Sequence, residues 1–255
     1  MKKPTYKVLS VFSIFLLALL FLIPTNVNAE EILDGDSAGD RNIVTIPELK
    51  QIEIGLQNAT SKEKVNDLLM KKELIERSQS NANVMATYPA KTIPVPHYKQ
   101  QNGYYCGPAT TKQTVQYMKG TSDSQATIAK ALGTTSNGTD GLKIVEYLNK
   151  RSNITWTIAT DTSINGLKIR INGAFKASEN RPPIVRAKFS KKGNWRYSTS
   201  GHFMNISGYT TNMAKIRVTD PNITRVDSSA TGSYYVTMNE IRNAIIDHWA
   251  QHMYW

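Results

Sequence analysis

The chain has 255 residues, with 31 Lys and Arg, 20 Asp and Glu, one cysteine and a formal net charge of +11 at pH 7. A single cysteine excludes an intramolecular disulfide, so the fold must rest on its hydrophobic core. The charge is uneven, because residues 30–90 carry 7 basic and 11 acidic side chains, whereas residues 91–255 carry 21 and 9. The basic part predicts attraction to an anionic cell envelope or an acidic substrate, although a plain solvated cationic surface explains it equally well. We find no nucleic-acid-binding motif and expect no nucleic-acid partner.

Residues 1–29 have the pattern of a secretory signal peptide. Lys2, Lys3 and Lys7 precede the apolar stretch 8–23, and Val27-Asn28-Ala29 ends in a small residue. This pattern predicts cleavage after Ala29. The alternative is an uncleaved membrane anchor, but the apolar stretch is near the short limit for spanning a bilayer. An exported protein without disulfides is typical of a Gram-positive bacterium. We therefore expect a secreted protein, which would associate with the cell wall if its basic surface binds there.

Residues 30–88 are predicted to form a helical segment followed by a linker. Helices are expected at 47–57 and 61–79, the second with a capping box in which Thr60 is the cap and Glu63 reaches back. A Ser-, Asn- and Ala-rich linker follows from Ser78 to Ala86. An acidic helical segment before a basic domain suggests a pro-region that covers the active site until it is removed. The alternatives are a hairpin docked permanently on the fold and a spacer to the cell surface.

Residues 89–255 are predicted to form an α+β domain, because helices come first and an antiparallel sheet follows. After a Pro-rich extended approach at 92–98, helices are expected at 106–119, 124–132, from 141 to about 149, at 163–177 and, last, at 238–248. Strands are expected at 154–159, 183–189, 201–209, 215–218 and 233–236.

The only cysteine, Cys106, falls where the loop Lys99–Tyr105 turns into a helix that continues through Pro108. A helix N-terminus favours the thiolate, which is the nucleophilic form of cysteine. The side-chain amide of Gln100 and the backbone N–H of Cys106 are suited to stabilise an oxyanion beside the sulfur. A lone cysteine is more often a small buried hydrophobe. The flanking Gly107-Pro108 and the export of a free thiol favour a chemical use.

A thiol nucleophile needs a base, and four histidines compete for this role. His202 is preferred because it follows Gly201 at the start of a predicted strand, where a side chain can face a cleft. His97 lies just before the cysteine loop. His248 and His252 lie in the C-terminal helix and tail, where structural roles are expected.

Asp220 is the expected partner of His202, because a carboxylate can hold the imidazole and favour its charged form. Asp220 stands at the end of the strand after that of His202. If the two strands pair through the turn at Thr210–Ala214, both ends fall at one sheet edge. An ordinary Asp-Pro turn is the alternative explanation of Asp220-Pro221.

Taken together, these motifs resemble the papain-like bacteriocin-processing peptidases, family thirty-nine of the cysteine peptidases, and most closely their stand-alone exported members. The resemblance covers about residues 92–250. Two features differ: Tyr105 stands where transporter-fused members usually have Asp, and the chain itself is exported, which sets it apart from cleavage of double-glycine leaders inside the cell. The residues that carry the resemblance are Gln100, Cys106-Gly107-Pro108-Ala109, Gly201-His202, Gly208-Tyr209 and Asp220-Pro221.

The resemblance implies a papain-like α+β fold with Cys106 as nucleophile, His202 as base, Asp220 as orienting residue and Gln100 in the oxyanion hole. It implies no metal and no cofactor. We therefore predict a secreted cysteine peptidase that acts on a peptide or protein through a thioester acyl-enzyme. A cell-wall peptide amidase or acyltransferase uses the same chemistry, and a non-catalytic peptide-binding module would keep the same fold.

Overall fold

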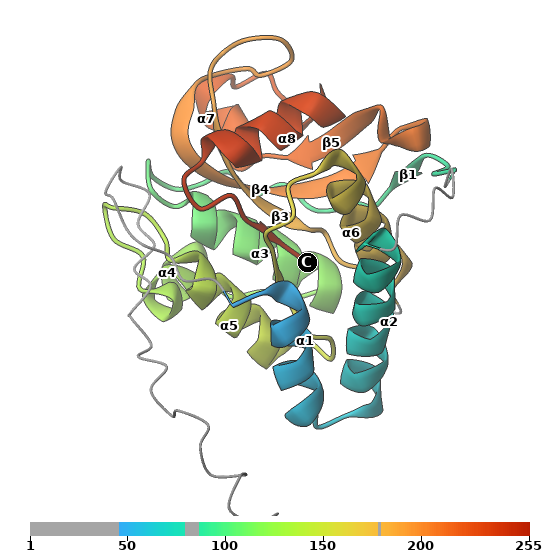
Figure 1. Ribbon diagram of the computed structural model, residues 1–255. Coiled ribbons are helices and arrows are strands. Elements are labelled where there is room, and N and C mark those ends of the chain that lie inside the picture. The colour runs from blue at the N-terminus through green and yellow to red at the C-terminus, as the bar shows by residue number, and fades with distance from the viewer. Residues whose placement is uncertain (1–45, 80–86, 178–179) are drawn as a thin grey trace, which may run out of the picture. The chain divides into compact units, whose positions relative to one another are not determined.

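The computed structural model describes residues 46–79, 87–177 and 180–255 (Figure 1). The expected signal peptide and most of the expected linker lie outside these ranges. Within them, no helix is long and apolar enough to cross a membrane. The helices are α1 (Glu48–Gln57), α2 (Lys62–Gln79), α3 (Cys106–Lys119), α4 (Gln125–Leu132), α5 (Gly141–Arg151), α6 (Ile164–Lys176), α7 (Ile223–Val226) and α8 (Met238–Asp247), with a short 3-10 turn at Thr211–Met213.

All strand pairs are antiparallel, and the sheet has the order β2-β7-β3-β4-β5-β6, with β1 added beside the end of β4. The α+β class with an antiparallel sheet is therefore confirmed. The strands are β1 (Lys91–Thr92), β2 (Ile158–Ala159), β3 (Ile184–Phe189), β4 (Thr199–Tyr209), β5 (Lys215–Thr219), β6 (Ser233–Thr237) and β7 (Met253–Tyr254).

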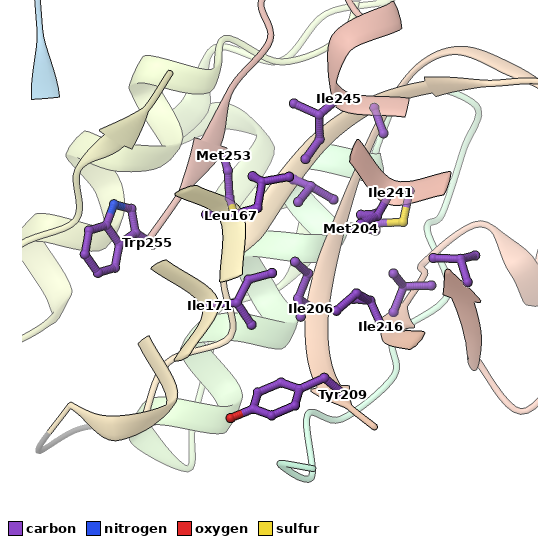
Figure 2. Close-up of a cluster of buried hydrophobic side chains, with 14 of the residues drawn as sticks. Leu167, Ile171, Met204, Ile206, Tyr209, Ile216, Ile241, Ile245, Met253 and Trp255 are labelled. Carbon is purple, nitrogen blue, oxygen red and sulfur yellow. The ribbon is translucent and has the colours of Figure 1, made fainter. Parts of the chain in front are cut away.

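Helices cover both faces of this sheet, because alternate residues of β3 and β4 enter different hydrophobic clusters. In β3, Val185 and Ala187 pack in a cluster with α6 and α8, whereas Ile184 packs in a cluster with α3, α4 and α5. Figure 2 shows the first cluster, where Leu167 and Ile171 of α6 meet Met204 and Ile206 of β4. The strand predicted at 183–189 therefore lies between two helical layers and contributes side chains to both.

Two expected elements differ from the structure for identifiable reasons. The predicted strand 154–159 reduces to β2, because the main chain of Thr155 and Trp156 bonds to side chains rather than to a neighbouring strand. Asp67 accepts from the N–H of Thr155, and Asn149 accepts from that of Trp156. The expected cap of α2 is displaced by one residue: the hydroxyl of Ser61, not that of Thr60, accepts from the N–H of Lys64.

The helical hairpin formed by α1 and α2 is joined to the rest of the chain by buried ion pairs. Glu48 of α1 binds the guanidinium of Arg170 at 2.7 Å, and Asp67 of α2 binds that of Arg181 at 2.8 Å. Lys71 of α2, which is fully buried, donates to the main-chain oxygen of Thr155 at 2.7 Å and to that of Trp255. Because α2 also packs against α6, the hairpin forms part of the domain core in this structure.

Two histidines lie in a buried basic cluster around Arg186 of β3. The guanidinium of Arg186 lies 4.7 Å from the ring of Trp249 and 5.3 Å from that of Phe203. Burial, followed by the charge of Arg186, lowers the pKa of His248 to about 3 and that of His252 to about 4. Both imidazoles are therefore neutral at physiological pH and pack as part of the fold, in the structural role that the sequence predicted.

This cluster predicts a loss of stability in mild acid. An unfolded histidine has a pKa of about 6.5, so below that pH the unfolded chain binds protons that the folded protein excludes. The free energy of unfolding should be intact above pH 7 and should fall by about 2 kcal/mol for each histidine between pH 7 and pH 5. Urea unfolding at both pH values measures this loss.

The matched control for the acid experiment is His248→Asn combined with His252→Gln. Asn can replace the ring nitrogen Nδ1 of His248, which accepts from the N–H of Ala250. The double variant should show a much flatter dependence on pH. An unchanged slope would mean that other groups cause the acid sensitivity.

Candidate active site

Helix α3 begins at Cys106, as predicted, and the side chain of this residue is only 2% exposed. The N-cap residue Tyr105 makes no side-chain cap, so it does not occupy the first-turn amides. Gly107 is required by packing, because a Cβ at this position would lie 2.4 Å from the hydroxyl of Thr139. Cys106 therefore sits at an uncapped helix start that is pressed closely against the chain before α5.

A buried polar network fixes α3 on strand β4, one turn after the cysteine. The hydroxyl of Thr110 donates to the carbonyl of Phe203 at 2.9 Å, and that of Thr114 donates to Asn205 at 2.8 Å. The side-chain amide of Asn205 donates in turn to the carbonyl of Thr110. Because Phe203 follows His202 directly, this network sets the start of α3 against the part of β4 that carries the predicted base. Cys106 and Phe203 share one buried cluster.

His202 and Asp220 meet as the register argument predicted. Strands β4 and β5 pair antiparallel, with Asn205 opposite Thr219. The ring nitrogen Nε2 of His202 lies 2.8 Å from Oδ1 of Asp220, and both side chains are buried. A carboxylate only accepts hydrogen bonds, so Nε2 carries the hydrogen and Nδ1 remains as the basic nitrogen of the neutral ring.

The Asp220 carboxylate has three further partners that the sequence did not indicate. Tyr197 donates its hydroxyl to Oδ2 at 2.9 Å and to Oδ1 at 3.1 Å, and Tyr234 donates to Oδ2 at 3.0 Å. The backbone N–H of Asn222 donates to Oδ1 at 2.8 Å. Burial alone would raise the pKa of Asp220, but His202 and these hydrogen bonds hold the pKa below its ordinary value. Asp220 is therefore an ionised group whose lone pairs are occupied.

Gln100 reaches the same place from the loop before α3. Its backbone N–H donates to the carbonyl of Pro221 at 2.9 Å, which ties the loop to the residue after Asp220. One hydrogen of its buried amide donates to the carbonyl of Asn102 at 2.7 Å. An amide nitrogen has two hydrogens, so Gln100 retains a second donor for a ligand.

His97, the candidate base before the cysteine loop, has a structural position, and so does Trp195. His97 binds the main-chain oxygen of Asp220 through Nε2 at 3.0 Å, and burial lowers its pKa. Its ring packs against Gly232, where a Cβ would lie 2.1 Å away and where φ is +87°. Trp195 stacks on Phe189 at 3.9 Å between ring centroids and is buried. Among the described residues, no cluster of three or more His, Cys, Asp or Glu side chains could hold a metal ion.

A cysteine at the start of a helix, joined through that helix to a sheet that carries a His–Asp pair, provides the components of a cysteine-peptidase domain. In agreement, the sequence model of the peptidase C39 like family matches residues 92–251. The chain belongs to the peptidase C39 like family, and the resemblance predicted from its motifs is confirmed.

The solved structures that are similar to this chain include two peptidases at low identity. A double glycine motif protease from an AMS/PCAT transporter, in complex with the leader peptide, is 15% identical with a TM-score of 0.42, over 64% of this chain and 91% of that chain. The peptidase domain of Streptococcus ComA, a bifunctional ABC transporter involved in a quorum-sensing pathway, is 18% identical with a TM-score of 0.42, over 63% and 96%. No curated protein matches the chain.

Proposed function

We propose that this protein is a secreted cysteine peptidase that cleaves peptide bonds through Cys106, His202 and Asp220. The observation that carries the proposal is the buried contact of 2.8 Å between Nε2 of His202 and Oδ1 of Asp220, on the strand to which the helix of the only cysteine is fixed. This contact commits one ring nitrogen to the carboxylate and leaves the other to act on a thiol.

The proposed reaction begins when Nδ1 of His202 takes the proton of Cys106. The thiolate attacks the carbonyl carbon of the substrate, and the oxyanion accepts hydrogen bonds from the N–H of Cys106 and from the amide of Gln100. The imidazolium then protonates the leaving amine as the C–N bond breaks, which leaves a thioester on Cys106. Water, deprotonated by His202, hydrolyses the thioester and restores the thiol. Asp220 stabilises the imidazolium in both halves of the reaction.

We propose that the protein is exported through its signal peptide and that its basic surface attracts it to the anionic cell envelope. For residues 30–88, two interpretations compete: a hairpin that stays docked on the fold, and a pro-region that is removed. The buried ion pairs of α1 and α2 favour the docked hairpin. The N-terminus of the active secreted protein decides between them. It is expected before Ile46, and a start after Gln79 would overturn the docked hairpin.

The proposed thiol chemistry predicts that Cys106 reacts with iodoacetamide well below the ordinary pKa of a cysteine thiol, which is about 8.5. Labelling of purified protein between pH 4 and pH 9, read by mass at Cys106, measures this reactivity. His202→Ala removes the base, so its labelling should slow and should rise only near the ordinary thiol pKa. His97→Ala is the matched control and should keep most of the reactivity.

Two outcomes would contradict the proposal. Labelling of the parent that rises only near the ordinary thiol pKa would mean that Cys106 is not activated. Equal profiles for the parent and for His202→Ala would mean that another group activates it. Both experiments work before any substrate is known.

A further inference from the structure

The two oxygens of Asp220 have different surroundings. Oδ1 receives Nε2 of His202 and the backbone N–H of Asn222, each at 2.8 Å, with a longer contact to Tyr197. Oδ2 accepts hydrogen bonds from two phenol hydroxyls, those of Tyr197 at 2.9 Å and Tyr234 at 3.0 Å. One oxygen thus faces the imidazole, and the other is held by tyrosines.

Neither tyrosine can easily turn away from the carboxylate. Tyr197 is buried and packs edge-on against His202, with ring centroids 5.9 Å apart, and against Phe189 at 5.2 Å. Tyr234 is 9% exposed and packs edge-on against Trp195 at 6.3 Å. Together with the Phe189–Trp195 stack, these rings form an aromatic wall behind the His–Asp pair.

A carboxylate with 0% exposure cannot replace lost donors by water from the surface. A buried group whose hydrogen bonds are removed bears the cost of its desolvation. Without the two hydroxyls, Oδ2 would lose both donors named above, and Asp220 would either bind a proton or rotate. In either case Oδ1 would no longer be held as a charged acceptor in line with His202.

We propose that Tyr197 and Tyr234 are positioning residues that keep Asp220 ionised and in a single orientation toward His202. We call the hydrogen bonds from Tyr197 and Tyr234 to Asp220 the tyrosine clasp. The catalytic meaning of this inference rests on the proposed function, but the effect of the clasp on the charge and orientation of Asp220 does not. The tyrosines act through Asp220 and have no assigned contact with the substrate.

The pKa shifts of the two tyrosines agree with this arrangement. Burial, followed by the charge of Asp220, raises the pKa of Tyr197 well above its ordinary value, and the same causes raise that of Tyr234. Both phenols therefore remain protonated over the working range of the protein and serve only as donors. The two phenols therefore do not themselves titrate in this range.

The other ionisable groups around Asp220 come from three segments. His97 faces the main-chain oxygen of Asp220 rather than its carboxylate. Arg196 and Asp227 lie on the outer side, where they line a surface pocket of about 270 Å³ together with Tyr234. His202 is the ionisable side chain that the carboxylate contacts directly. Removing the tyrosine hydroxyls changes none of these groups.

The test is the titration of the Asp220 carboxyl carbon by NMR in protein labelled with ¹³C at aspartate, with the signal assigned by Asp220→Asn. In the parent, Asp220 should titrate below the ordinary Asp value of about 3.9. Tyr234→Phe should raise its pKa by about one to two units, because a hydrogen bond to a charged group is worth that much. Tyr197→Phe should do the same, and the double variant should show the largest rise.

Tyr235→Phe is the matched control, since Tyr235 neighbours Tyr234 in β6 but is 41% exposed. It should leave the titration unchanged. Phenylalanine keeps each ring in the aromatic wall, and if the double variant does not fold, the two single variants carry the test. Titration of Asp220 at the parent value in the variants that fold would overturn the proposal.

Labelling of Cys106 with iodoacetamide in the same variants separates the clasp from the proposed function. If both hold, the acid limb of the labelling profile moves to higher pH in the Phe variants, while the rate above neutral pH changes little. If the parent thiol is not activated, the proposed function fails, yet the carboxyl titration still decides whether the tyrosines hold Asp220.

Discussion

Replacing Cys106 by alanine is expected to reduce peptide hydrolysis by about a millionfold, as loss of a nucleophile does in other triad hydrolases. The reason is that the chain has no second cysteine and therefore no second thiol to form the thioester. The measurement is the release of peptide fragments from an unstructured protein substrate, followed by mass spectrometry, with the melting temperature recorded for each variant.

Two variants control this experiment. Cys106→Ser keeps the size of the side chain and should be nearly as inactive, because an alcohol is a far weaker nucleophile than a thiolate at neutral pH. Lys119→Ala changes the exposed far end of the same helix and should keep full activity. Hydrolysis that persists in Cys106→Ala would show that the reaction does not use the thiol.

Asp67→Ala is expected to lower the free energy of unfolding by about 3–5 kcal/mol, because removing one member of a buried ion pair leaves the other charge unpaired. Asp67 binds Arg181, and the exposures of the two side chains are 2% and 0%. The same carboxylate accepts from the backbone N–H of Thr155. The measurement is equilibrium unfolding in urea at pH 7.

Glu53→Ala is the matched control on the same hairpin. Glu53 pairs with Lys50 on the surface of α1, where both side chains are more than half exposed. Loss of such a pair costs about 0.5 kcal/mol or less. Equal effects of the two substitutions would mean that the hairpin is not anchored by its buried charges and would remove the main argument that it stays docked.

The order and type of most elements follow from the sequence because they depend on local patterns. Thr237 illustrates this: its hydroxyl accepts from the N–H of Glu240, and the Glu240 carboxylate accepts from the N–H of Thr237, so helix α8 begins where the sequence placed it. Strands β4 and β5, on either side of the Thr210–Ala214 turn, are neighbours in sequence and pair with each other. For this reason the contact between His202 and Asp220 was predictable. Short separations leave few alternative pairings.

The sequence did not predict β1 or β7, because two-residue strands carry no periodicity and exist only through their partners. Met253 of β7 pairs with both Ala159 of β2 and Val185 of β3, which lie 94 and 68 residues earlier by their numbers. The expected strand 154–159 failed for the related reason that side chains from distant segments take up its backbone groups. Long-range partners decide such segments, and no local window contains them.

By itself the sequence determined the family, the helix start at Cys106, the His202–Asp220 register and the position of Gln100 in the loop before the helix. Only the tertiary structure decided that Tyr197 and Tyr234 hold the carboxylate, and that Glu48, Asp67 and Lys71 are buried rather than solvated. A tyrosine or a charged residue looks the same in a sequence whether it faces water or a partner. Burial removes water from a polar group, and the partner that then satisfies it comes from wherever the folded chain brings one.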